Sequence, residues 1–247
     1  MTAVLRRFDE LWGPQIVGAC ADALEADGLA ISLSVAEAPY AEPLWWTPGV
    51  AARFEDLQYT LGEGPGPEAL RAGQHVLEPD LAGVLPSRWP ALTPAAYKAG
   101  VRGACSYYLG TSAVRVGVMT VVTCRQHVFS LQHYLDALAL VDRIITGLSR
   151  AAPQEMGLDT PDEDDTDLLW GPDADWPVVH QATGMVSAQL GLSLVDALAR
   201  LRAYAYANDV LLIEVAQGVV ARRIHIPGDE GNGRDWADEG EDDRLDP

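Results

Sequence analysis

An acidic stretch without a basic residue divides this 247-residue chain into two parts. Residues 154–175 carry nine acidic side chains, within a chain whose formal net charge is −19. Like charges at this density repel one another and disfavour a packed core. A chain of this length is long for one compact domain and sufficient for two. We therefore expect residues 154–175 to be an acidic linker between two folded units.

Most of the remaining acidity lies at the C-terminal end. Residues 224–247 hold nine acidic residues against two arginines, a composition that predicts an acidic disordered tail. Residues 176–223 hold only three acidic residues and four arginines. The second unit is therefore nearly neutral and lies between two strongly acidic segments, whose simplest role is solubility.

Composition and cysteine spacing limit the class of protein. Hydrophobic residues make up 48% of the chain, but no apolar run approaches the roughly 20 residues of a membrane span. The start, MTAVLRRFDELW, turns acidic too early for a secretory signal. Cys20, Cys105 and Cys124 are odd in number and far apart, so they indicate neither a disulfide framework nor a zinc site. We expect a reduced, cytoplasmic protein with no membrane partner.

The first unit, residues 9–150, shows the pattern of a mixed α+β fold. Apolar residues at helical spacing predict helices over 14–26, 90–100 and 130–150. Short or alternating apolar runs predict strands over 29–35, 43–50, 74–81, 101–110 and 113–124. The last two strands surround Gly110-Thr111-Ser112 and are expected to form a hairpin.

The helix over 130–150 has a heptad-like apolar seam. Ser130 is a good N-cap for it. Apolar residues recur at steps of three and four at Leu131, Leu135, Leu138, Val141, Ile145 and Leu148. Such a seam packs either on the sheet of its own unit or on a second copy of the helix. We expect a homodimer, with packing on the sheet as the alternative.

The second unit, residues 176–223, reads as three short helices and is expected to be all-α. They are predicted over 179–190, from Ser193 to about 207, and over 210–223. Gly191 suits the end of the first, and Ser193 with Asp196 resembles a capping box at the start of the second. A unit of this size has a marginal core, so we expect it to lean on a partner or on the first unit.

The second unit resembles the ANTAR domain of transcription antitermination regulators. Residues at corresponding places run from VVHQATGMVSAQLG to LLIEVAQGVV, namely Val179, Ala182, Gly184, Ala197, Leu201, Arg202, Leu212, Val215, Ala216, Val219 and Val220. The resemblance implies a module that binds paired hairpins in nascent RNA and lets the polymerase read through a terminator. It also implies that Thr183, Gly184, Arg200, Arg202, Arg222 and Arg223 are RNA-binding candidates.

Two departures from the ANTAR pattern remove positive charge. Thr183 stands where a lysine is usual, and Ile213 stands where a basic residue is common, followed by Glu214. RNA affinity depends heavily on phosphate neutralisation, so both changes would weaken it. Arg202 is either an RNA contact or a structural arginine that pairs with Glu214 or caps a helix end. His180 is expected on the helix surface rather than as a ligand.

The first unit resembles a GAF domain, in the variant found in front of ANTAR domains. The most specific stretch is Leu61-Gly62-Glu63-Gly64-Pro65, with Gly66 where relatives often have a cysteine. The resemblance implies a small-molecule pocket on one face of the sheet, with candidates Gly62, Glu63, Gly64 and Trp89. The alternative is a tight turn before a helix, which glycines also favour. No motif selects a cofactor or ligand among the cyclic nucleotides, tetrapyrroles and other small molecules that GAF domains bind.

Together the two resemblances predict a signal-responsive regulator in which a GAF sensor controls an ANTAR unit that binds RNA. The alternative is a signalling protein whose second unit no longer binds RNA and acts through protein contacts. Some GAF-fold proteins reduce methionine sulfoxide with cysteines, and Cys105 and Cys124 are placed on neighbouring strands here. We expect these cysteines to be inert and the chain not to be an enzyme.

Overall fold

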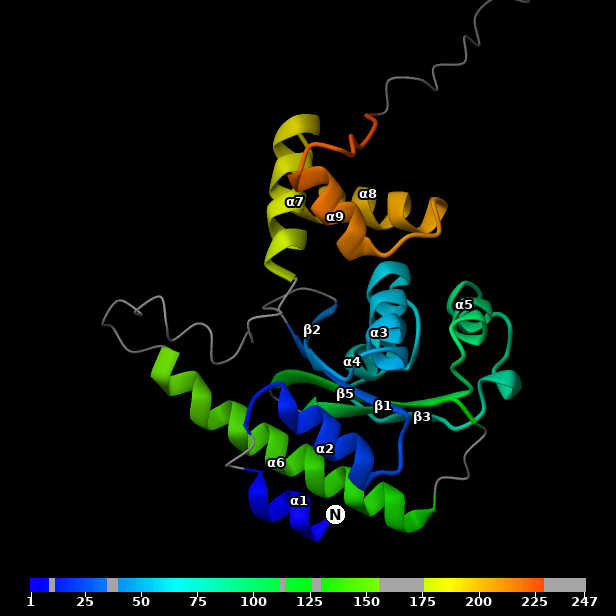
Figure 1. Ribbon diagram of the computed structural model, residues 1–247, viewed down its shortest axis with the longest axis vertical. Coiled ribbons are helices and arrows are strands. Elements are labelled where there is room, and N and C mark those ends of the chain that lie inside the picture. The colour runs from blue at the N-terminus through cyan, green and yellow to red at the C-terminus, as the bar shows by residue number, and fades with distance from the viewer. Residues whose placement is uncertain (9–11, 35–39, 112–113, 126–129, 156–175, 229–247) are drawn as a thin grey trace, which may run out of the picture.

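A five-stranded antiparallel sheet forms the centre of the first unit (Figure 1). The computed structural model describes residues 1–8, 12–34, 40–111, 114–125, 130–155 and 176–228. The strands pair in the order β2–β1–β5–β4–β3. They are β1 Gly28–Ser34, β2 Ala41–Trp46, β3 Val76–Glu78, β4 Gly103–Gly110 and β5 Arg115–Thr123. The predicted hairpin is confirmed, because β4 and β5 pair along their whole length.

One face of the sheet is apolar and is covered by helices from both ends of the unit (Figure 1). These helices are α1 Thr2–Arg7, α2 Gln15–Ala23 and α6 Leu131–Glu155. Leu29, Ile31 and Met119 of the sheet lie in one buried cluster with Leu140 and Ile144 of α6. The alternation along β1 and β5 sends every second side chain into this cluster, as expected for a half-apolar strand.

The other face of the sheet is covered by α3 Val50–Leu61, α4 Pro65–Ala72 and α5 Leu92–Lys98, with a short 3₁₀ turn at Leu81–Gly83 (Figure 1). It mixes apolar and polar side chains. Val118 and Val122 pack there, but Ser32, Ser106 and Thr120 are buried on the same face. The Ser106 and Thr120 hydroxyls are hydrogen-bonded to each other at 2.9 Å.

Three helices of the second unit, α7 Trp176–Leu190, α8 Leu194–Ala207 and α9 Leu212–Val220, pack around a small core of their own. This core includes Tyr59 of α3, so α3 lies between the sheet and the second unit (Figure 1). Gly191 ends α7 with a positive φ of 66°, and the Ser193 hydroxyl accepts the N–H of Asp196 at the start of α8, both as predicted. The small unit therefore leans on the first unit, as its size required.

Four features differ from the sequence predictions or extend them. Helices α1 and α3 were not predicted, and α6 continues to Glu155. The predicted tail begins too early, because Ile226 is 2% exposed and packs against the second unit. In α6, Val141 faces the sheet, but Leu131 and Leu135 are 73% and 50% exposed. The linker over 156–175 and the tail beyond 228 lie outside the described residues.

Across the described ranges, no single helix is long and apolar enough to cross a membrane. Helices α7 and α8 meet that test only when taken together, and they are bent by 106° at the break between them. In the same part of the chain, no group of three or more histidine, cysteine or carboxylate side chains is placed to hold a metal ion.

Candidate ligand cavity at the junction of the two units

The turn between α3 and α4 brings backbone unusually close to side chains. Gly62 ends α3 in the left-handed conformation, with a φ of 65°, and Gly64 precedes α4 with a φ of 121°. A Cβ atom on Gly64 would lie 2.6 Å from both Gln58 and Leu92. Pro65 then occupies the first turn of α4, where its missing N–H costs nothing. The glycines thus serve a tight turn before a helix, the alternative raised by the sequence.

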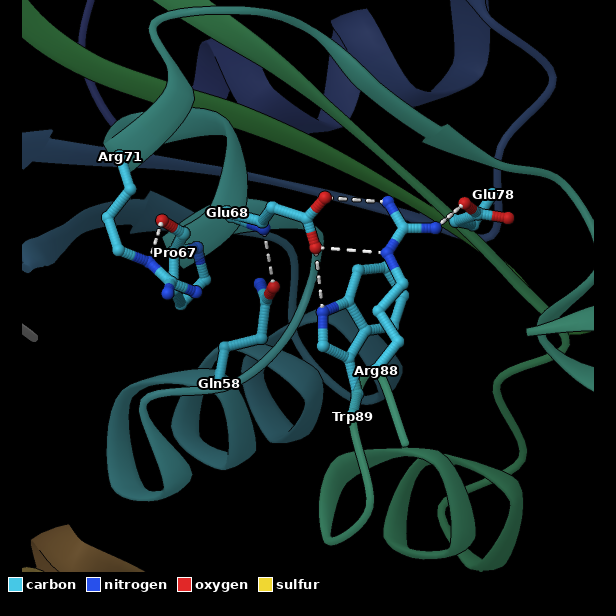
Figure 2. A network of polar contacts seen from close by, with 8 residues as sticks. Gln58, Pro67, Glu68, Arg71, Glu78, Arg88 and Trp89 are labelled. Carbon is cyan, nitrogen blue, oxygen red and sulfur yellow. Dashed lines mark hydrogen bonds and ion pairs between the residues drawn. The ribbon is translucent and has the colours of Figure 1, made fainter. Parts of the chain in front are cut away.

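A buried chain of polar side chains runs from this turn to the sheet. Gln58 accepts the N–H of Gly66 at 2.8 Å and donates to Glu55 at 2.9 Å (Figure 2 shows Gln58 reaching toward α4). Ser32 of β1 donates to the other carboxylate oxygen of Glu55 at 3.2 Å. Glu55 is buried, and loss of water raises its pKa from 4.5 to about 7, although the hydrogen bonds from Thr120, Ser32 and Gln58 act in the opposite direction.

This polar chain borders a cavity of about 240 Å³ between the sheet, α3 and α4. Its walls come from both units of the protein. They are Ser32, Tyr40, Ala41, Glu55, Gln58, Tyr59, Gly62, Gly66, Pro67, Arg71, Val118 and Arg202. A second hollow of about 360 Å³ also reaches Glu55 and is lined by Trp46 of β2 and by Ile213 of α9. Both hollows therefore lie where the second unit rests on α3.

Arg202 of α8 closes the first cavity from the side of the second unit. Its guanidinium carbon lies 4.1 Å from the ring centre of Tyr59 and 4.8 Å from that of Tyr40, which is cation–π geometry on both rings. Its Nε and Nη2 atoms are buried and have no hydrogen-bond partner among the described residues. Glu214, proposed as its partner, instead accepts the N–H of Leu211 at the start of α9. The structure therefore does not show the Arg202–Glu214 pair, which was one of the alternatives left open by the sequence.

Other polar contacts also join the two units. His180 of α7 is hydrogen-bonded to buried Glu42 of β2 at 3.1 Å, which raises the pKa of His180. Asp56 of α3 accepts the N–H of Leu212 at the start of α9, and burial raises its pKa from 3.8 to about 7. At the edge, exposed Lys98 and Asp209 form an ion pair at 2.6 Å.

Two of the predicted pocket residues have other positions. Glu63 accepts the N–H groups of Ala91 and Leu92 at 2.9 and 3.0 Å and so caps α5. Trp89 is 1% exposed in the core beside α4, where its indole N–H donates to Glu68 (Figure 2). Gly62 does line the cavity, whereas Gly64 supports the turn beside it. Trp45 is buried in the apolar core on the opposite face.

Trp89 belongs to a network of polar contacts around Glu68 of α4 (Figure 2). Arg88 forms an ion pair with Glu68 of α4 at 2.7 Å and a second with Glu78 of β3. Glu68 thereby holds both Arg88 and the indole of Trp89. This network fixes the segment between β3 and α5 against α4 and forms the outer support of the cavity rather than its wall.

The predicted RNA-binding residues are divided among three places. Thr183 is 7% exposed and its hydroxyl donates to the carbonyl of Val179, so it lies inside the three-helix core. Arg202 lies at the junction with the first unit. Arg200 and Gly184 are half-buried, and Arg222 and Arg223 are exposed at the end of α9. A Cβ atom on Gly184 would meet open space, so that position leaves room for a partner.

The cysteines are not arranged as a reactive pair. Burial raises the pKa of the Cys20 and Cys105 thiols to about 12, and Cys124 is exposed just beyond β5 with a raised pKa. Cys105 faces Val121 in the neighbouring strand rather than Cys124. Raised pKa values disfavour the nucleophilic thiolate at neutral pH.

The sequence interpretation missed the residues that define the cavity, which are Tyr40, Glu55, Gln58, Tyr59 and Arg71. A signal was present in VAARFEDLQYTL, where Glu55 and Gln58 fall at the helical spacing of Ala51 and Phe54. Polar residues on the inward stripe of an amphipathic helix indicate a buried polar site. The contribution of Arg202 carried no such signal, because it depends on how the two units meet.

No family model matches the chain, and no curated protein matches it. Among solved structures, the GAF domain of a phosphoenolpyruvate-protein phosphotransferase from Coxiella burnetii has a TM-score of 0.49 and 13% identity, covering 62% of this chain and 95% of that chain. The GAF domain of a phosphoenolpyruvate-protein phosphotransferase from Acinetobacter has a TM-score of 0.47 and 15% identity, covering 62% of this chain and 96% of that chain. SdiA from Escherichia coli has a TM-score of 0.45 and 15% identity, covering 91% of this chain and 98% of that chain. TM-scores below 0.5 at such identities identify neither a ligand nor an activity.

Proposed function

We propose that this chain is a ligand-responsive regulator in which a GAF-like sensor controls an ANTAR-like unit that binds RNA hairpins and promotes transcription through terminators. The observation that carries the proposal is the shared cavity, whose wall includes Arg202 of the second unit. A molecule bound there contacts both units at once. It therefore has a differential affinity for the docked and undocked arrangements, which a regulatory ligand requires.

The direction of control follows from Arg202. In the docked arrangement its guanidinium lies over the rings of Tyr40 and Tyr59 and is withdrawn from any RNA. RNA that needs this charge competes with docking, and by reciprocity a ligand that stabilises docking weakens RNA binding. The unit retains Arg222 and Arg223 as exposed charges in either arrangement.

The test is a titration of the full chain with a paired-hairpin RNA at two salt concentrations. We expect salt-sensitive binding, because each phosphate that an arginine neutralises releases counterions. The double variant Arg222→Ala/Arg223→Ala should lose at least tenfold in affinity and have a weaker salt dependence. Arg115→Ala, at an exposed position of β5, is the matched control and should bind as the wild type does. Equal affinities for wild type and double variant would contradict the assignment of these arginines.

A second candidate function is a signalling protein that acts through protein contacts without RNA. Two positions favour it. Thr183 is buried in the core, and Ile213 lines the hollow beside Trp46, so neither supplies a charge to RNA. No RNA binding by the full chain at low salt, or by a His180→Gln variant that loses a contact at the junction, would leave this candidate as the function.

The proposal places the regulator in the cytoplasm as a homodimer without catalytic activity. Exposed Leu131 and Leu135 at the start of α6 support a dimer seam that leaves the junction free. Light scattering tests it. Leu135→Glu should convert a dimer to a monomer, whereas a monomeric wild type would remove the dimer from the proposal.

A further inference from the structure

The Arg202 guanidinium faces the 240 Å³ cavity and is hydrogen-bonded to Tyr59, but this bond leaves two of its nitrogens without an acceptor. Nε and Nη2 are buried without a hydrogen-bond partner in the described part of the chain. A buried donor without an acceptor costs about 1–3 kcal/mol, and more when it is charged. Native structures rarely leave such donors unpaired, and a bound anion or water is the usual explanation.

The surrounding carboxylates do not supply the missing acceptor. Glu55 is engaged by Ser32 and Gln58, and burial rather than a neighbouring positive charge dominates its pKa. Glu42 is hydrogen-bonded to His180. The Arg202 guanidinium is therefore a fixed positive charge in the cavity that neither Glu55 nor Glu42 pairs with. Arg71 is a second cation, at an exposed position of the wall.

Size and lining limit what can balance that charge. Sites for drug-sized ligands measure roughly 300–1,000 Å³, so the volume of this cavity suits a molecule smaller than a tetrapyrrole. The rings of Tyr40 and Tyr59 and the side chains of Pro67 and Val118 give the walls an apolar part. A planar guanidinium matches the geometry of a carboxylate in two parallel hydrogen bonds. A doubly charged phosphate would face Glu55, whose ionisation it would oppose.

We propose that the cavity binds a small organic acid as its carboxylate anion, with Arg202 of α8 as the group that recognises the charge. This inference rests on the proposed sensor function and names the class of its ligand. The acid connects the second unit to the first, because its carboxylate is held from α8 and its apolar part lies against α3 and α4. Occupancy therefore stabilises the docked arrangement.

The test is calorimetric titration of the full chain with propionate, pyruvate and benzoate, each against its uncharged amide. We expect at least one acid to bind and its amide to bind at least tenfold more weakly. Arg202→Gln should lower the affinity for that acid at least tenfold, and Arg202→Lys should restore part of it. An amide that binds as well as its acid would overturn the assignment of charge recognition. Failure of all three acids to bind up to 10 mM would overturn the ligand class and leave ordered water as the partner of Arg202.

Two control variants separate a direct contact from a general loosening of the junction. His180→Gln removes a junction contact outside the cavity, and Arg115→Gln removes an exposed arginine from β5. Both should bind the acid within threefold of wild type. If His180→Gln loses as much affinity as Arg202→Gln, Arg202 acts through docking and the assignment fails.

A carboxylate can also come from the acidic residues beyond 228. Deletion of residues 229–247 distinguishes the two sources. Unchanged acid affinity supports a free acid, whereas a tenfold gain identifies the chain's own tail as the competing occupant and replaces the proposal. The RNA titration is independent of these outcomes: a chain that binds the hairpin but no acid keeps the proposed output and loses this ligand.

Discussion

The two faces of the central sheet are built from the same strands but from different chemistry. Toward α2 and α6 the sheet presents Leu29, Ile31 and Met119. These side chains lie in one buried cluster with Leu140 and Ile144 of α6. Toward α3 and α4 it presents Ser32, Ser106 and Thr120 among smaller apolar residues. The strand period of two allows one sequence to carry both patterns.

This contrast separates the face that contributes most to stability from the face that borders the cavity. Buried apolar area stabilises a fold directly, at about 25 cal/mol per Å². Buried polar groups contribute little net free energy even when they are hydrogen-bonded, and they are costly when they are not. The face under α3 therefore contributes less to stability than the apolar face, and it borders a cavity with polar walls. The two faces should respond differently to the same kind of perturbation.

The largest effect is expected on the apolar face. Ile144 is fully buried between α6 and the sheet, so Ile144→Ala should lower the free energy of unfolding by about 2–5 kcal/mol. Urea unfolding followed by circular dichroism measures the change. Asp142→Ala, on the same helix but at an exposed position, is the control and should cost less than about 1 kcal/mol. Equal losses in the two variants would mean that α6 does not pack as described.

The next largest effect is a loss of stability with rising pH that comes from groups on the polar face and at the junction of the two units. Glu55 and Asp56 have pKa values raised to about 7, and the pKa of His180 is also raised. All three groups bind a proton more tightly in the folded protein than in the unfolded chain. Their contribution is therefore present at low pH and is lost as the pH rises, for the carboxyls between about pH 4 and 7 and for His180 above its ordinary pKa of 6.5.

We expect the free energy of unfolding to fall by up to about 3 kcal/mol from Glu55 over this range. Asp56 is only half-buried and should contribute less. Urea unfolding at a series of pH values from 5 to 8 measures the slope. Glu55→Gln should flatten it, because the amide keeps the shape of the side chain without a titrating proton. An unchanged slope in this variant would show that Glu55 does not titrate in this range.

The turn that borders the cavity should respond to a single methyl group. Gly64→Ala places a Cβ atom 2.6 Å from Gln58 and Leu92 at a φ of 121°, where side chains rarely occur. Strain of this kind costs on the order of 1–3 kcal/mol. Gly73→Ala is the matched control, because Gly73 also has a positive φ, of 64°, but open space around its Cβ position. Thermal unfolding should show a larger loss for Gly64→Ala, and equal losses would mean that contact with Gln58 is unimportant.

How much of this could be predicted follows from the same comparison. The apolar face could be predicted from the alternation of LAISLSV and from the heptad-like steps of residues 130–150. An interface without water needs apolar residues at every inward position, so its pattern is regular. Helix α3 escaped prediction because Glu55 and Gln58 occupy inward positions and interrupt its apolar stripe. The face that borders the cavity is thus less visible in the sequence, because the polar residues that line the cavity interrupt the apolar pattern.

The glycine turn was located from the sequence, but its neighbours were not. Gly62 lines the cavity, whereas Trp89 lies in the core and Glu63 caps α5. Arg202 was singled out as an RNA contact, a partner of Glu214 or a helix cap, and none of these alternatives included Tyr40 and Tyr59. Contacts between separately folded units depend on tertiary placement, which neither periodicity nor local spacing encodes.

The smallest effect is expected at the edge of the junction, and it sharpens the contrast between central and peripheral polar groups. Lys98 and Asp209 join the two units by an ion pair whose side chains are 66% and 75% exposed. Water and salt screen such a pair, and ordering two mobile side chains offsets its attraction. Lys98→Ala should therefore leave the thermal midpoint and the affinity for the RNA hairpin unchanged within error. A different result would be a gain in RNA affinity for Lys98→Ala as large, in fold-change, as the loss of acid affinity for Arg202→Gln. Docking would then depend on the peripheral ion pair as much as on Arg202, and the contrast between central and peripheral groups would fail.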